Sequence, residues 1–173
     1  MKEVNTLAFK GIRRSIGDLI GDAVARPEPD WHALYGDVGL RNTAADAAHH
    51  CAQLISEGAS PDECWRFGIL QTLDYYDSAV RRGGISLGKQ VFSEEPERTG
   101  DQSIDAAFAA LADHVATRDG WESPAWAKDE SRHTSQPWYA MSPASQRNEA
   151  QKESPRSFRD RGIFITPYAL ARA

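Results

Sequence analysis

The residues best placed to do chemistry in this sequence are two aspartates and the ionisable side chains expected near them. Asp74 and Asp77 lie three residues apart, so a helix would place both on one face. Joined by Glu63 or His49 from a neighbouring helix, they could form a carboxylate metal site inside a helical bundle. Di-metal bundles build such sites from Glu-x-x-His pairs, and this set of residues does not have that form. A metal-dependent enzyme is therefore kept as an alternative only.

Other signatures of catalysis are weak or missing. His49 and His50 are adjacent, so on a helix they point about 100° apart and cannot share a metal ion as i, i+4 partners can. The chain has no GxxxxGK[ST], GxGxxG, HExxH or CxxC motif, so the usual residues for phosphate binding and zinc-protease chemistry are lacking. We assign no catalytic residue and no cofactor, and do not expect an enzyme.

Composition indicates an ordinary soluble domain. The 173 residues are 40% hydrophobic and 26% charged, with a mean hydropathy of −0.57. No apolar run approaches the roughly 18 residues of a membrane span, and the first residues lack the apolar core of a signal peptide. We expect a cytoplasmic protein in which Cys51 and Cys64 are structural thiols.

The charge is distributed unevenly along the chain. Residues 1–119 hold 12 Lys and Arg against 19 Asp and Glu, a net of −7, whereas residues 120–173 hold 8 against 6, a net of +2. An acidic body repels nucleic-acid phosphates and suits a partner with a basic surface. Ordinary solvated helix faces would give the same composition.

Hydrophobic periodicity predicts an all-α fold, a bundle of four or five helices in residues 1–120. The start of one helix is marked by Ser60 and Glu63, which can form a capping box with Pro61 at the first helical position. Its apolar stripe runs from Cys64 through Phe67 to Val80. Residues 85–102 are expected to be an exposed connection. The expected helices span Phe9 to Ala23, Asn42 to Glu57, Ser60 to Arg82 with Gly83 and Gly84 just beyond its end, and Asp101 or Ser103 to Asp119.

Residues 121–173 have a different character and are expected to wrap around the body of the same domain as a docking segment. Trp and Pro residues interrupt them, and only short helices are expected near residues 144–151 and 154–160. Residues 162–166 form a strand-like run, and Pro167 begins a terminal helical turn.

Three arginines surround Phe158 just before that run, and Arg and aromatic residues dominate the hot spots of protein interfaces. In an equally weighted alternative, Phe158 and the apolar run attach the segment to the helical body. The arginines would then face acidic helix surfaces such as those of Asp105 and Asp113. The three arginines are Arg156, Arg159 and Arg161.

Several C-terminal elements together resemble a family of small bacterial proteins, frequent in actinobacteria, that are antitoxin-like partners of nucleotidyltransferase-type toxins. The resemblance covers about the last 75 residues and implies a helical, non-enzymatic protein that binds and silences an enzyme encoded beside it. It assigns no functional residues. The elements are Thr99-Gly-Asp101, a helix ending near His114-Val-Ala, Pro124-Ala-Trp126, Trp138-Tyr139 and the segment from Ser154 to Ile165 with its Phe-Arg-Asp-Arg-Gly-Ile-Phe run.

We therefore expect the acidic body to cover the basic cleft of a partner toxin while the tail supplies buried anchors. On this hypothesis Phe158→Ala weakens the complex without unfolding the body. A homodimer is compatible with the alanine-rich helix faces. A transcriptional regulator is a further alternative, although the acidic body offers no basic recognition helix. The expected partner-binding anchors are Trp126, Trp138, Phe158, Arg159, Arg161 and Phe164.

Overall fold

The computed structural model describes residues 15–17, 21, 25, 40 and 42–171. The chain divides into two units, residues 1–30 and 31–173, and the hydrophobic core lies in the second unit. The helix expected from Phe9 to Ala23 lies mostly outside the described residues.

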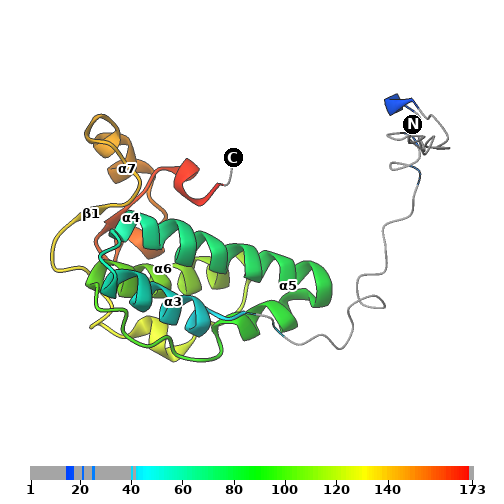
Figure 1. The fold of residues 1–173 in the computed structure, drawn as a ribbon, viewed down its shortest axis with the longest axis horizontal. Helices are drawn as coiled ribbons and strands as arrows, with labels where there is room; N and C mark the ends of the chain where they lie inside the picture. The colour runs from blue at the N-terminus through cyan, green and yellow to red at the C-terminus, as the bar shows by residue number, and fades with distance from the viewer. Residues whose placement is uncertain (1–14, 18–20, 22–24, 26–39, 41, 172–173) are drawn as a thin grey trace, which may run out of the picture. The chain divides into compact units, whose positions relative to one another are not determined.

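The second unit is mainly helical, which confirms the predicted all-α class (Figure 1). Its two strands have two residues each and pair in parallel, with Trp138 opposite Ile163. Among the described residues, no helix is both long and apolar enough to cross a bilayer. The elements are α3 (Ala44–Ser56), α4 (Pro61–Cys64), η1 (Trp65–Ile69), α5 (Leu70–Gly88), η2 (Lys89–Phe92), α6 (Gln102–Asp119), η3 (Ala125–Lys128), β1 (Trp138–Tyr139), η4 (Ala144–Gln146), α7 (Arg147–Glu153), α8 (Arg156–Arg159), β2 (Ile163–Phe164) and η5 (Pro167–Leu170).

Local capping chemistry sets the starts of α4 and α6 and the end of α6 as the sequence predicts. The Ser60 hydroxyl accepts the Glu63 backbone N–H, and the Glu63 carboxylate accepts the Ser60 N–H at 2.7 Å, which completes the capping box of α4. At the start of α6 the Asp101 carboxylate accepts the N–H of the second helical residue. Gly120 ends α6 in the left-handed region, with φ of 73°.

A continuous rod runs from α4 through η1 into α5, and η1 is a π-helix of five residues. The rod packs closely on α3 at Gly68, where the absence of a side chain leaves room for the Cys51 sulfur. A Cβ added to Gly68 would overlap that sulfur. The π-helix also shifts the buried stripe of the rod: Trp65 and Ile69 are fully buried, while Phe67 is 55% exposed. The prediction that Phe67 continues the apolar stripe is therefore wrong.

The expected exposed connection from residue 85 to 102 is also partly wrong. Gly83 and Gly84 leave the helical conformation, and Gly84 has φ of 68°, which a glycine adopts without strain. The chain reverses there and continues as a helical turn into η2, whose Val91 and Phe92 are fully buried. The glycines thus create a kink, and the segment after it adds to the core. Only the portion after Phe92 runs as an irregular connection.

α6 is the most deeply buried helix of the described part. Every residue from Ile104 to Ala112 is buried, including Asp105, because small alanines let neighbouring segments approach on all sides. α3, the rod, η3 and α8 all contact it, and Figure 1 shows it behind α3 and α5. The C-terminal segment therefore closes the core around α6.

Candidate protein-interaction surface

Three of the six expected anchors are buried, two of them in the hydrophobic core. Phe158 is completely buried, and its ring centroid lies 5.9 Å from that of Trp65 and 5.7 Å from that of His114. Trp126 is 8% exposed and donates its indole N–H to the Phe92 carbonyl. These rings are not available to a partner in this conformation and attach the tail to the body. The alternative interpretation gave this role to Phe158, whereas Trp126 was expected only as an anchor for the partner.

Arg161 is the third buried member and links three elements. Its guanidinium donates to an Asp113 carboxylate oxygen at 3.2 Å, to the Ser157 carbonyl at 2.7 Å and to the Ala127 carbonyl at 2.6 Å. The arginine is 7% exposed. The expected pairing of a tail arginine with Asp113 is therefore present. Asp105, the other acidic residue named for this role, instead accepts hydrogen bonds from Thr99.

The remaining three expected anchors keep some exposure. Arg159 is exposed at the end of α8, whereas Trp138 and Phe164 are half-buried. The Trp138 ring meets Trp65 edge to face at 5.7 Å, and the Phe164 ring stacks on Tyr139 at 5.2 Å. These two aromatics are thus largely occupied by contacts within the chain.

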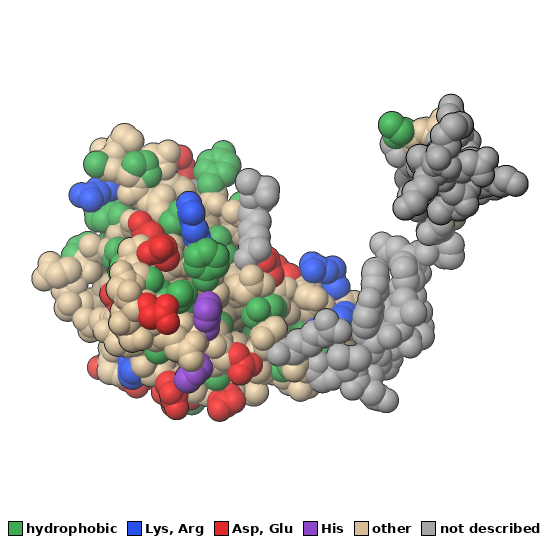
Figure 2. All heavy atoms as spheres, viewed as in Figure 1, with side chains coloured by type: hydrophobic (Ala, Val, Ile, Leu, Met, Phe, Trp, Pro, Cys, Tyr) green, Lys and Arg blue, Asp and Glu red, His purple; other side chains and the backbone are tan. Residues whose placement is uncertain are grey.

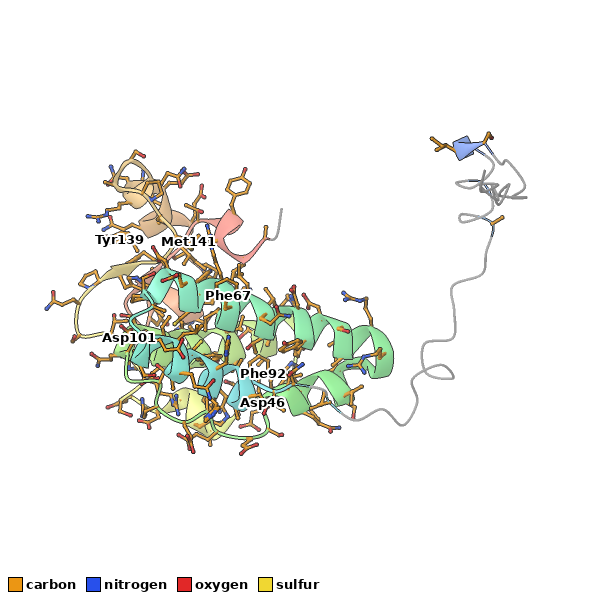
Figure 3. The ribbon with its side chains drawn as sticks, viewed as in Figure 1. Asp46, Phe67, Phe92, Asp101, Tyr139 and Met141 are labelled. Atoms are coloured by element: carbon orange, nitrogen blue, oxygen red, sulfur yellow. The ribbon has the colours of Figure 1, made fainter. Side chains whose placement is uncertain are left out.

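The most exposed aromatic rings of the described part are Phe67 and Tyr168, which the sequence did not single out as anchors. Phe67 lies on η1 and is 55% exposed, and Tyr168 lies on η5 and is 79% exposed. Figure 3 shows Phe67 on the first turns of the rod, at the end of the molecule that also carries Tyr139 and Met141. Both exposed rings belong to segments that meet at Trp65, whose indole N–H donates to the Ala169 carbonyl at 3.1 Å.

An acidic face lies along α3 and α4, and one of its members, Glu63, is one helical turn before Phe67. It consists of the exposed carboxylates of α3, α4 and the turn between them, and Figure 2 shows acidic and histidine side chains over α3 on this side. No Lys or Arg occurs from residue 42 to residue 64. The Ser60 backbone N–H, and after it the Ser60 hydroxyl, holds the pKa of Glu63 below its usual value, so this carboxylate is ionised at neutral pH. The acidic face comprises Asp46, Glu57, Asp62 and Glu63.

The residues of the alternative metal site do not converge. Asp77 pairs with Arg118 of α6 at 2.7 Å, Glu63 caps its own helix, and the His49 ring contacts Gln53. Within the part of the chain that the structure describes, no three His, Cys, Asp or Glu side chains are grouped to hold a metal ion.

A glycine-rich run that begins at the α5 kink has the spacing of two catalytic motifs. Gly84-Ile85-Ser86-Leu87-Gly88 has the GxSxG spacing of a nucleophile elbow, and Gly83 to Gln90 differs from a phosphate-binding loop in ending on Gln rather than Ser or Thr. Both motifs require a strand, a turn and a helix. Here a helix precedes the glycines, and Ser86 lies inside the helical turn after them. The run therefore matches these motifs in spacing only.

A groove of about 650 Å³ lies beside the contact between α6 and α8 and is lined by residues of both helices. Two carboxylates and two guanidinium groups in its lining offset each other, so the groove does not favour a ligand of either charge. Burial, followed by the charge of Arg118, lowers the pKa of His114 in this groove. The lining residues are Asp113, His114, Thr117, Arg118, Pro155, Arg156, Ser157 and Asp160.

The lowered pKa of His114 predicts a pH dependence of stability. The folded state favours the neutral imidazole, so the unfolded state binds the proton more readily once the pH falls through the usual value of 6.5. The free energy of unfolding should therefore decrease on acidification from pH 7.5 to 5.5. The decrease is complete only when the pH lies below the folded-state pKa of His114. Urea unfolding of His114→Gln across this range should show a smaller decrease than the wild type; an identical decrease would contradict the assignment. Asp113, Asp119, Asp160, Arg118 and Arg156 face the imidazole or line its groove and remain in both proteins.

The two cysteines are free and buried on neighbouring helices. Each thiol lies near the carbonyl of the other residue, at 3.7 Å for the Cys51 sulfur and 3.9 Å for the Cys64 sulfur. Burial raises the pKa of Cys51 to about 12, which leaves little reactive thiolate at neutral pH. This environment agrees with a structural role.

No protein-family model matches the chain, and no curated protein or solved structure similar to it is found.

Proposed function

We propose that the protein is an antitoxin-like inhibitor that binds a toxin enzyme encoded by the adjacent gene and covers its active site. The acidic face carries the proposal. Four exposed carboxylates without an intervening Lys or Arg complement a basic nucleotide-binding cleft, and such complementarity speeds association and selects the partner. The same charges disfavour nucleic acid as a partner of the body.

The resemblance of the C-terminal elements to antitoxin-like proteins supports the same function and a cytoplasmic site of action. In this proposal the buried tail residues Trp126, Phe158 and Arg161 support the helical body, and the partner contacts the exposed surface. Inhibition is then steric and electrostatic, through a preformed helical surface. A rigid surface loses little conformational entropy on binding, which favours a tight complex.

Co-expression with the product of the adjacent gene tests this function. The wild type should restore growth and co-purify with the toxin. A Glu57→Lys/Asp62→Lys variant should bind about tenfold or more weakly, chiefly through slower association at low salt. Glu149→Lys/Glu153→Lys on exposed α7 makes the same change in net charge without altering any residue of the acidic face, and it should bind like the wild type.

Circular dichroism would confirm that both variants are folded. Equal losses of affinity in the two variants would show that overall charge, and not the acidic face, governs binding. The absence of any effect on the neighbour's toxicity would refute the antitoxin function itself.

A further inference from the structure

We infer that copies of this chain associate head to tail, through a basic tip at the α5 kink of one copy and the acidic turn between α3 and α4 of the next. The basic tip comprises residues 81–89, and the acidic turn comprises residues 57–63. Both belong to the second unit and to the part of the chain that the structure describes. Such association needs only this chain, so it goes beyond the proposed toxin complex and does not rest on it.

A tight reversal of the helix builds the basic tip. Gly84 has φ of 68°, and beyond it the chain turns back on the helix that precedes it. Gly88 packs on Val80 so closely that an added Cβ would overlap a Val80 methyl carbon. Arg81 and Lys89 directly follow these two contacting residues, so the contact places their backbones side by side at this end of the rod.

The tip carries cations without a carboxylate that neutralises them. Residues 78–93 contain Arg81, Arg82 and Lys89 and no Asp or Glu. Arg81 and Lys89 are exposed, and no carboxylate of the described residues pairs with any of the three cations. The preceding carboxylate, Asp77, pairs with an arginine of α6 at 2.7 Å. Figure 2 shows Lys and Arg side chains at this end of the second unit, on a chain whose net charge is −5.

The acidic turn lies at the other end of the same rod. Glu57, Asp62 and Glu63 are exposed within seven residues, and no Lys or Arg occurs from residue 42 to residue 64. The rod begins at Pro61 and reaches the kink about twenty residues later, so its ends are roughly 30 Å apart at the helical rise per residue. Figure 1 shows α4 and the far end of α5 at opposite ends of the second unit. The two charged surfaces therefore cannot meet within one molecule, whereas a second molecule can bring them together.

A second copy is the partner that fits the tip best. Its acidic turn supplies carboxylates opposite the cations, and it can cover Ile85, which is 41% exposed on the tip. Nucleic acid would bring phosphates to the tip but would also meet the acidic body, which has a net charge of −7 over residues 1–119. The contact joins two different surfaces, so a pair keeps one free tip and one free turn, to which further copies can be added. Because the acidic turn is part of the acidic face, a copy bound there would exclude a basic partner from it.

Sedimentation equilibrium of the full chain measures the association. Exposed ion pairs are weak and are screened by salt, so the wild type should form dimers and larger species as its concentration rises at low salt, and about 0.5 M salt should return it to the monomer. Arg81→Glu/Lys89→Glu and Glu57→Lys/Asp62→Lys should each weaken association about tenfold or more, because each gives the tip and the turn charges of the same sign. An equimolar mixture of the two variants should associate again, because each surface then meets its opposite charge.

Lys152→Glu/Arg159→Glu is the matched control for the substitution of the tip. It makes the same change in net charge at exposed positions of α7 and α8 and alters no residue of the tip or the turn, so it should associate like the wild type. Circular dichroism verifies that each variant is folded.

A wild type that stays monomeric at every concentration at low salt would refute head-to-tail association, and this measurement needs no variant. Association that persists in both charge-reversed variants, or a mixture that fails to restore it, would place the contact elsewhere on the chain and also refute the inference. Equal weakening in the control would show that net charge governs association, with the same consequence. Toxin binding is measured separately by co-expression of the wild type, so the proposed function stands or falls on its own result.

Discussion

Phe158→Ala is expected to lower the free energy of unfolding by about 3–5 kcal/mol, the usual cost of truncating a fully buried phenylalanine. The ring is completely buried against Trp65 and His114, so its removal leaves a cavity between the rod, α6 and α8. The sequence hypothesis was that this variant loses partner binding while the body stays folded. The burial of Phe158 instead makes loss of stability the direct effect.

Urea denaturation followed by circular dichroism measures this change, and Phe164→Ala provides the comparison. Phe164 is half-buried and stacks on Tyr139 at the β1–β2 pair, so its truncation should cost clearly less. A loss below about 1 kcal/mol for Phe158→Ala would mean that the tail does not complete the core in solution.

Arg161→Met is expected to lower the free energy of unfolding by about 3 kcal/mol, because it leaves buried acceptors without their donor. The substitution preserves much of the aliphatic stem but removes every hydrogen bond from the guanidinium to Asp113, Ser157 and Ala127. Two of these acceptors are backbone carbonyls of η3 and α8, so the loss of the hydrogen bonds should destabilise the packing of both elements.

Arg159→Met is the matched control, because Arg159 is exposed two residues earlier and its removal should change stability by less than about 0.5 kcal/mol. Asp113→Asn, alone and combined with Arg161→Met, completes a double-mutant cycle by chemical denaturation. A coupling energy near zero would show that the ion pair itself contributes nothing, whatever the cost of Arg161→Met.

The helix starts and the end of α6 could be predicted because they depend on neighbouring residues. Ser60, Glu63, Asp101 and Gly120 satisfy or terminate backbone hydrogen bonds within a few positions of themselves. The glycines at the α5 kink were misread for a related reason. A glycine with positive φ can end a helix or reverse it, and the outcome depends on whether the residues after it find a place in the core.

The candidate site was harder to predict because exposure depends on the whole fold. Phe67 fits the apolar stripe that a regular α-helix would have in this sequence. The π-helix shifts that stripe, so that Trp65 and Ile69 are buried instead. Phe158 and Arg161 are of residue types that are common in interface hot spots. The same residue types also stabilise a fold from buried positions. Only long-range packing against Trp65 and Asp113 distinguishes the two roles.

The burial of Phe158, Ile163 and Ile165 with α6 also has a consequence for synthesis of the protein. A ribosome that has just completed α6 has not yet made these three residues, so the nascent helices lack part of their core. The core therefore becomes complete only after Ile165 has been translated, through contacts between distant parts of the chain. A chain terminated after α6 would leave Trp65 and the alanine-rich helix without these contacts, and exposed apolar surface of this kind favours aggregation.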